Sequence, residues 1–150
     1  MIVNRQLSVL AERVTHSPEE TVSFGHELAM YLQPPCLVLL EGDLGAGKTT
    51  LIKGIVAGLG AASEDEVTSP SFTLVHEYGT PGQVIHADLY RIDGPRALAT
   101  LGLEDLSNQP VTVLVEWGEK LGDSAPTPCI RIRMEHHGLN DRRILVERVE

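Results

Sequence analysis

Apolar residues in the first third of the chain switch between strand-like and helical spacing. Residues 7–14 alternate loosely between apolar and polar side chains, which predicts a strand. From residue 22 to residue 32 the apolar positions recur every three or four residues, which predicts a helix that covers one face of a sheet. Its ends carry matching signals, because Ser17 can cap the first turn, Pro18 fits the first helical position and Pro34 stops the helix.

A second strand and a second helix are expected directly afterwards. Residues 36–41 form a nearly continuous apolar run, as in a strand that is buried on both faces. Apolar residues between positions 51 and 59 again have helical spacing, and Gly60 is expected to end that helix. The stretch that separates these two elements, residues 42–50, is rich in glycine and therefore favours a tight turn.

The middle of the chain predicts a hairpin and little regular helix. Residues 72–78 and 83–87 are expected to be strands, and the Gly-Thr-Pro-Gly sequence at 79–82 favours a turn between them. A short helix is expected over residues 96–101. Residues 102–108 are expected to be irregular or to form one helical turn.

The last third of the chain completes an α/β pattern. Residues 111–115 form another buried apolar run, expected to be a parallel strand, while 129–136 and 142–149 alternate in the manner of a closing antiparallel hairpin. Strands and helices in this order predict a three-layer α/β domain. Its central sheet is expected to be mainly parallel, with antiparallel strands at the flanks. The length suits one domain over residues 1–150.

The glycine-rich turn has the spacing of a phosphate-binding loop. Gly42 is followed by four residues and then by Gly47-Lys48-Thr49, between an expected strand and an expected helix. Glycines allow successive backbone N–H groups to turn inward around phosphate oxygens, and the start of a helix adds positive potential. A lysine supplies a mobile charge for the terminal phosphates, and a threonine hydroxyl suits a phosphate-bound Mg²⁺. Nucleotide binding is the resulting hypothesis, and the predicted three-layer α/β domain is then of the P-loop NTPase type.

Two acidic residues follow apolar strands and compete for the role of holding a metal. Asp88 comes at the end of the strand expected at 83–87, and Glu116 comes at the end of the strand expected at 111–115. Carboxylates at the carboxyl ends of strands are where phosphate-loop proteins place the residue that holds Mg²⁺, directly or through water. The sequence does not rank the two.

Three further features near these carboxylates allow two interpretations each. The hydroxyl-rich segment 68–72 can reach a terminal phosphate or its Mg²⁺, or be a polar turn. Arg91 can contact phosphate or form an ordinary ion pair with a nearby aspartate, Asp88 or Asp93. Trp117 is either a mobile gate or a core residue, and the core interpretation is favoured.

Other compositional features mainly exclude classes of function. A formal net charge of -9 argues against independent binding of nucleic acid. Cys36 and Cys129 are expected to be buried thiols of a reducing compartment, which indicates the cytoplasm. No run is long enough to span a bilayer, and the spacing of Cys129, His136 and His137 does not favour a zinc site.

Four segments together resemble one family, the bacterial tRNA threonylcarbamoyladenosine biosynthesis protein TsaE. They are residues 42–49, 68–72 and 86–91, followed by Val115-Glu116-Trp117. The order and spacing of all four make the resemblance distinctive, and it extends over nearly the whole chain. Ser71 stands where threonine is common, and Gly118 stands where proline is frequent.

The resemblance implies a small ATPase that uses ATP and Mg²⁺ and works with the TsaD and TsaB proteins. That assembly attaches a threonylcarbamoyl group to the adenosine beside the anticodon, and the ATPase resets the partner pair between cycles. The tRNA would then be contacted indirectly, through the complex. Alternatives from other classes are a small-molecule kinase and a nucleotide-gated binding module. No long arginine-rich lid supports the kinase.

Site roles follow as hypotheses. The phosphates of ATP are expected on the loop residues Gly45, Ala46, Gly47, Lys48, Thr49 and Thr50. Thr49 and Glu116 are expected to hold Mg²⁺, and Asp88 is expected to orient the attacking water or support the metal shell. Phosphoryl transfer depends on positioning and charge stabilisation in a closed site, so hydrolysis is expected to be weak for the chain alone and faster with partners.

Overall fold

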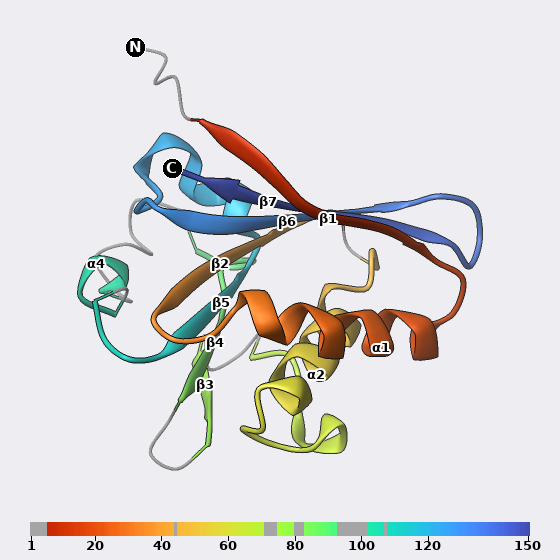
Figure 1. Cartoon of the computed structure of the whole chain (residues 1–150), viewed down its shortest axis with the longest axis horizontal. Coiled ribbons are helices and arrows are strands. Elements are labelled where there is room, and N and C mark those ends of the chain that lie inside the picture. The colour runs from red at the N-terminus through yellow and green to blue at the C-terminus, as the bar shows by residue number, and fades with distance from the viewer. Residues whose placement is uncertain (1–5, 44, 71–74, 80–82, 93–101, 107) are drawn as a thin grey trace.

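The protein is built around a seven-stranded sheet, here seen in a computed structural model (Figure 1). The structure describes residues 6–43, 45–70, 75–79, 83–92, 102–106 and 108–150. The strands are β1 (Leu7–Thr15), β2 (Cys36–Glu41), β3 (Val75–Tyr78), β4 (Val84–Asp88), β5 (Thr112–Glu116), β6 (Cys129–His136) and β7 (Arg142–Val149). Their order across the sheet is β1-β7-β6-β2-β5-β4-β3.

The centre of the sheet is parallel and its flanks are antiparallel. β2 lies between β5 and β6 and is parallel to both, and β4 is parallel to β5. β3 pairs antiparallel with β4 at one flank, while β7 pairs antiparallel with β6 and β1 at the other. The strands predicted as continuous apolar runs are central, because a strand covered on both faces needs apolar side chains on both. The predicted α/β P-loop NTPase architecture is confirmed.

Helices cover the two faces of the sheet unequally. α1 (Pro18–Leu28) continues as the 3₁₀ turn η1 (Ala29–Tyr31) and packs beside α2 (Lys48–Gly58) on one face. The shorter α4 (Leu103–Leu106) and the 3₁₀ segment η3 (Gly118–Ser124) contribute Leu103 and Leu121 to the core on the other face. Figure 1 shows α1 and α2 together on one side of the sheet and α4 on the opposite side. Each face therefore has its own apolar core.

Glycines allow α1 and α2 to approach closely. A Cβ added to Gly54 would lie 2.0 Å from the carbonyl oxygen of Val22, and one added to Gly25 would lie 2.5 Å from that of Leu51. Both distances are shorter than any non-bonded contact between a carbon and an oxygen atom, so a side chain at either position would force the helices apart. The close packing fixes α2 against α1, and with it the loop from which α2 begins.

Most predicted boundaries are close to the observed ones. Ser17 caps α1 as predicted, because its hydroxyl accepts a hydrogen bond of 3.1 Å from the backbone N–H of Glu20. The α-helix ends at Leu28 rather than at residue 32, since the chain tightens into η1 before the prolines. A 3₁₀ turn, η2 (Glu64–Glu66), precedes the hydroxyl-rich segment, and Ser63 and Glu66 cap it reciprocally.

Several expectations concern residues outside the described part of the chain. The helix expected over 96–101 lies there, as do residues 71 and 72 of the hydroxyl-rich segment and the turn at 80–82. Residues 102–108 include one helical turn, α4. Within the described ranges, no helix combines the length and the apolar character needed to cross a membrane.

Candidate nucleotide-binding site

The glycine-rich loop joins β2 to α2 at the carboxyl end of the parallel strands. Gly47 is the N-cap of α2 with φ at 97°, in the left-handed region that a glycine adopts without strain. The backbone N–H of Ala46 donates to the carbonyl of Asp43 over 3.0 Å, which turns the chain back toward the helix. The loop thus brings the positive N-terminal end of an 11-residue helix to the edge of the sheet.

Lys48 is the first residue of α2, and its side chain lies across the loop. Its Nζ donates to the carbonyl oxygen of Gly42 over 2.5 Å and lies 3.4 Å from the centre of the Trp117 ring, a cation–π contact. Burial lowers the pKa of the Lys48 ammonium, and nearby carboxylates, led by Glu119 and Glu116, act in the opposite direction. A buried ammonium in this environment is favourably placed to bind an anion.

Asp88 and Glu116 lie side by side on adjacent strands. They are register partners in the parallel pairing of β4 with β5, and both are buried. The Glu116 carboxylate accepts hydrogen bonds from two of the described side chains. Its Oε1 accepts from the Thr49 hydroxyl over 3.2 Å, and its Oε2 accepts from Nε2 of His86 over 2.7 Å. The end of β5 therefore brings the Glu116 carboxylate against the loop threonine.

Asp88 is held by a different pair of donors. The Ser69 hydroxyl donates to its Oδ2 over 3.0 Å, and the backbone N–H of Tyr90 donates to its Oδ1 over 2.8 Å. Ser69 belongs to the hydroxyl-rich segment for which the sequence left two interpretations open. In the structure Ser69 contacts the acidic edge of the site, so this residue of the segment belongs to the site.

These side chains line a single cleft of about 500 Å³, called here the loop cleft. Its walls are Gly45, Gly47, Lys48, Thr49, Thr50, Ser69, Asp88, Tyr90, Arg91, Glu116 and Trp117. Trp117 is half-buried, lies 5.2 Å from the Tyr90 ring between centroids, and has a left-handed backbone with φ at 62°. The favoured core interpretation of Trp117 is therefore incomplete, because the ring packs against the core and also walls the cleft.

The donor set of the loop cleft fits a magnesium ion that is bound to phosphates. Mg²⁺ prefers oxygen ligands and keeps several waters, so few protein groups suffice. The Thr49 hydroxyl and the Glu116 carboxylate provide oxygen atoms 3.2 Å apart beside the loop. Among the described residues no group of three or more His, Cys, Asp or Glu side chains could hold a metal alone.

Sequence reasoning missed two polar residues of this region. Glu119 accepts a hydrogen bond of 3.1 Å from the backbone N–H of Gly42, at the first residue of the loop. His86 is completely buried beneath Glu116. A signal for His86 was present, because a polar residue two positions before Asp88 must face the same side of the strand. Glu119 follows the left-handed turn at Trp117 and carries no such signal.

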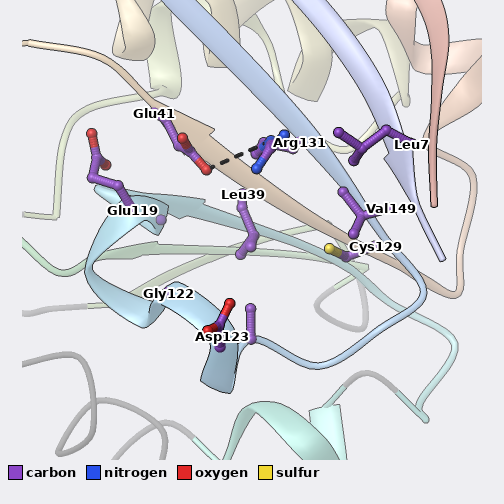
Figure 2. Close-up of a pocket in the computed structure, with 11 residues that line it drawn as sticks. Leu7, Leu39, Glu41, Glu119, Gly122, Asp123, Cys129, Arg131 and Val149 are labelled. Carbon is purple, nitrogen blue, oxygen red and sulfur yellow. Dashed lines mark ion pairs between the residues drawn. The ribbon is translucent and has the colours of Figure 1, made fainter. Parts of the chain in front are cut away.

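A second cleft of about 450 Å³ opens on the other face of the sheet, called here the η3 cleft (Figure 2). Its walls include Leu39, Glu41, Glu119, Asp123 and Arg131. Figure 2 shows the Glu41 and Arg131 side chains pointing toward each other, at 4.0 Å between Oε2 and Nε. None of the predicted phosphate-binding residues lines this cleft, whereas five of the six, Gly45, Gly47, Lys48, Thr49 and Thr50, line the loop cleft.

Comparison of this sequence with known proteins identifies the family to which the chain belongs. The family model for the threonylcarbamoyl adenosine biosynthesis protein TsaE matches residues 15–144. The chain belongs to the TsaE family. The TsaE protein of Haemophilus influenzae is 39% identical over 73% of this chain and 69% of its own length. That of Bacillus subtilis is 35% identical over 87% of this chain and 80% of its own length.

A solved structure supports the same fold. The crystal structure of YdiB from Bacillus subtilis superposes with a TM-score of 0.75 at 30% sequence identity, covering 99% of this chain and 90% of that one. The family resemblance drawn from the four sequence segments is thus confirmed. TsaE membership and the P-loop fold together imply nucleotide binding, while the assignment of individual residues stays a prediction.

Proposed function

We propose that this chain is the ATPase component of the bacterial machinery that makes threonylcarbamoyladenosine in tRNA. Residues 1–150 would act as one ATPase domain that supports turnover of the TsaD and TsaB proteins. The observation that carries the proposal is convergence: Lys48, Thr49, Asp88 and Glu116 come from three separate segments and line one cleft. The relatives, each named a tRNA threonylcarbamoyladenosine biosynthesis protein, supply the pathway.

The loop would bind the phosphates of ATP. Backbone N–H groups from Gly45 to Thr50 lie at the start of α2, where the helix dipole favours negative charge. The contacts that Lys48 now makes, with the Gly42 carbonyl and the Trp117 ring, would be exchanged for contacts with the terminal phosphates.

Thr49 and Glu116 would hold Mg²⁺ through the Thr49 hydroxyl and Oε1 of Glu116, which already face each other. When bound, Mg²⁺ would neutralise charge that develops on the phosphate oxygens. Asp88 would accept a hydrogen bond from the attacking water and align it, or would bind the water shell of the metal. Its second oxygen would stay fixed by the Tyr90 N–H.

Slow hydrolysis by the isolated chain is part of the proposal. Catalysis of phosphoryl transfer depends on positioning and on exclusion of water, and the loop cleft is partly open to solvent. Partners that order the segment at 68–72 and fix Trp117 would close it. The net charge of -9 supports contact with tRNA through those partners rather than directly.

The test is Mg²⁺-dependent ATP hydrolysis by the purified chain, alone and with TsaD and TsaB. Lys48→Ala is the negative control, because it lacks the ammonium expected to bind the terminal phosphates. Lys53→Ala is a matched control, because Lys53 lies on the same helix but donates to the backbone carbonyl of Val67 and does not line the cleft. Stimulation by the partners in wild type and in Lys53→Ala, and its absence in Lys48→Ala, is the expected result.

Other outcomes separate the alternatives. ATP binding without stimulated hydrolysis, together with ATP-dependent assembly with TsaD and TsaB, would overturn the ATPase role in favour of a nucleotide-gated module. Hydrolysis that rises only when an acceptor metabolite is added would indicate a kinase.

A further inference from the structure

His86 is a polar residue at a position where an apolar one would be expected. It is the third residue of β4, between Ile85 and Ala87, and its side chain is completely buried. The proposed chemistry gives it no role. Yet its Nε2 lies 2.7 Å from Oε2 of Glu116, a shorter hydrogen bond than the 3.2 Å one from the Thr49 hydroxyl.

This hydrogen bond fixes the tautomer of the ring. An ionised carboxylate only accepts hydrogen bonds, so Nε2 of His86 must carry the proton. The opposite nitrogen, Nδ1, is buried and has no hydrogen-bond partner in the described part of the chain. Burying a polar ring that makes a single hydrogen bond costs free energy, which an apolar side chain of similar size would not. The contact with Glu116 is therefore the polar interaction that accounts for a histidine here.

Neighbouring rings hold the imidazole in place. The His76 ring packs edge-on to it with centroids 6.5 Å apart, and the Tyr78 ring lies at the same distance on a tilted plane. Both come from β3, the strand paired with β4. A ring confined in this way has few orientations, so its Nε2–H points at a fixed place at the end of β5.

We propose that His86 is the positioning residue for Glu116. By holding Oε2 beneath the site, it turns Oε1 toward the Thr49 hydroxyl and toward the position of the phosphate-bound metal. This inference rests on the proposed function, because it concerns how Glu116 serves a magnesium nucleotide. Hydrogen-bond partners that orient metal ligands typically change metal affinity or activity by roughly 10- to 100-fold when they are removed.

The test compares two substitutions of nearly equal shape. In His86→Gln the amide N–H extends about as far from the backbone as Nε2 does, and in His86→Met a side chain of similar length has no donor. Binding of a non-hydrolysable ATP analogue is measured by calorimetry, with Mg²⁺ and with EDTA. We expect the gain in affinity from Mg²⁺ to fall roughly 10-fold or more in His86→Met and to be largely kept in His86→Gln.

A merely structural role predicts another result. Loss of packing would lower the melting temperature and weaken binding with and without Mg²⁺ alike, in both variants. A gain from Mg²⁺ that is unchanged in a folded His86→Met protein would overturn the proposal. In a Glu116→Gln background, His86→Met should have no further effect on the gain from Mg²⁺, and an effect of the same size as in wild type would also contradict it.

The wild-type protein offers a test that needs no folded variant. The nitrogen chemical shifts of the His86 ring report which nitrogen carries the proton. A proton on Nε2 is required, and a ring that carries its proton on Nδ1 alone would overturn the inference. Failure of the proposed function is distinguishable, because wild type would then show no Mg²⁺-dependent binding of the analogue at all.

Discussion

Buried carboxylates on the two faces of the sheet have different kinds of polar partner. On the face of α2, Glu116 accepts hydrogen bonds from a threonine hydroxyl and an imidazole. On the other face, Glu147 lies 3.3 Å from a guanidinium nitrogen of Arg131 and 3.8 Å from one of Arg133. Exposure does not explain the difference, because Glu116 is 4% and Glu147 is 7% exposed.

The two carboxylates differ in how much of their negative charge remains available to a bound ligand. A carboxylate between two guanidiniums has its charge compensated within the protein and contributes to the fold. A carboxylate held by a hydroxyl and an imidazole N–H keeps its charge and can contribute it to a bound cation. The same contrast distinguishes the clefts: Lys48, Asp88 and Glu116 line the loop cleft, and the Glu41–Arg131 ion pair lies in the η3 cleft.

The largest expected effect is on turnover at the face of α2. Glu116→Gln and Asp88→Asn keep side-chain size but remove the charge. Each should reduce ATP hydrolysis by the partnered complex by roughly 100-fold or more, as expected when a metal-holding or water-orienting group is lost. Binding of ATP should change much less. The ratio of the two effects is measured by steady-state kinetics and calorimetry, and equal hydrolysis by wild type and both variants would refute the assignments.

A second effect is expected on nucleotide affinity. Lys48→Ala removes a charged donor to phosphate, a contribution of about 1.5–3 kcal/mol, or roughly 10- to 100-fold in affinity. Calorimetry with a non-hydrolysable ATP analogue measures it. Lys53→Ala is the control, and a loss of affinity as large in Lys53→Ala would show that the helix, and not the Lys48 ammonium, is responsible.

The opposite face should respond in stability instead. Glu147→Gln removes the charge that faces Arg131 and Arg133, and we expect the free energy of unfolding to fall by about 1–3 kcal/mol. ATP affinity should stay unchanged, since none of these three residues lines the loop cleft. Denaturant unfolding and calorimetry on the same samples check both expectations. If Glu147→Gln left the stability unchanged and weakened nucleotide binding, the assignment of Glu147 to the fold rather than to ligand binding would be contradicted.

The smallest effect is expected at an exposed ion pair. Nδ1 of His16 lies 2.9 Å from Asp141, and this hydrogen bond raises the pKa of His16 above its ordinary value of 6.5. Protonated His16 therefore stabilises the folded state at pH values below 6.5, and this contribution disappears as the pH rises through the raised pKa. Thermal melts of wild type and His16→Asn should differ slightly on the acidic side and converge in alkaline buffer. A gap that widens with pH would contradict this assignment.

The local part of the fold could be predicted from the sequence. Residue spacing identified β2, the phosphate loop and α2, because strand, turn and helix are contiguous and their signals are local. Convergence of Asp88 and Glu116 also followed, since parallel strands end at the same edge of the sheet. The pairing of β1 with β7 joins the two ends of the chain, and no local pattern encodes it.

Contacts that depend on strand register lay beyond the sequence. The hydrogen bond from His86 to Glu116 requires β4 and β5 to be neighbours in one particular register. The contact of Glu119 with Gly42 requires the chain to turn sharply at Trp117, where a non-glycine residue has a positive φ. Such conformations are uncommon for a tryptophan, so sequence patterns do not indicate them.

The most direct test of the central claim is a crystal structure of the chain with Mg²⁺ and a non-hydrolysable ATP analogue. The account predicts phosphates on the backbone of residues 45–50 and Mg²⁺ within about 2.0–2.1 Å of the Thr49 hydroxyl oxygen, with Oε1 of Glu116 as a ligand directly or through water. The guanidinium–carboxylate contacts of the other face should be unchanged. A nucleotide in the η3 cleft, or a metal held away from both Thr49 and Glu116, would contradict the account.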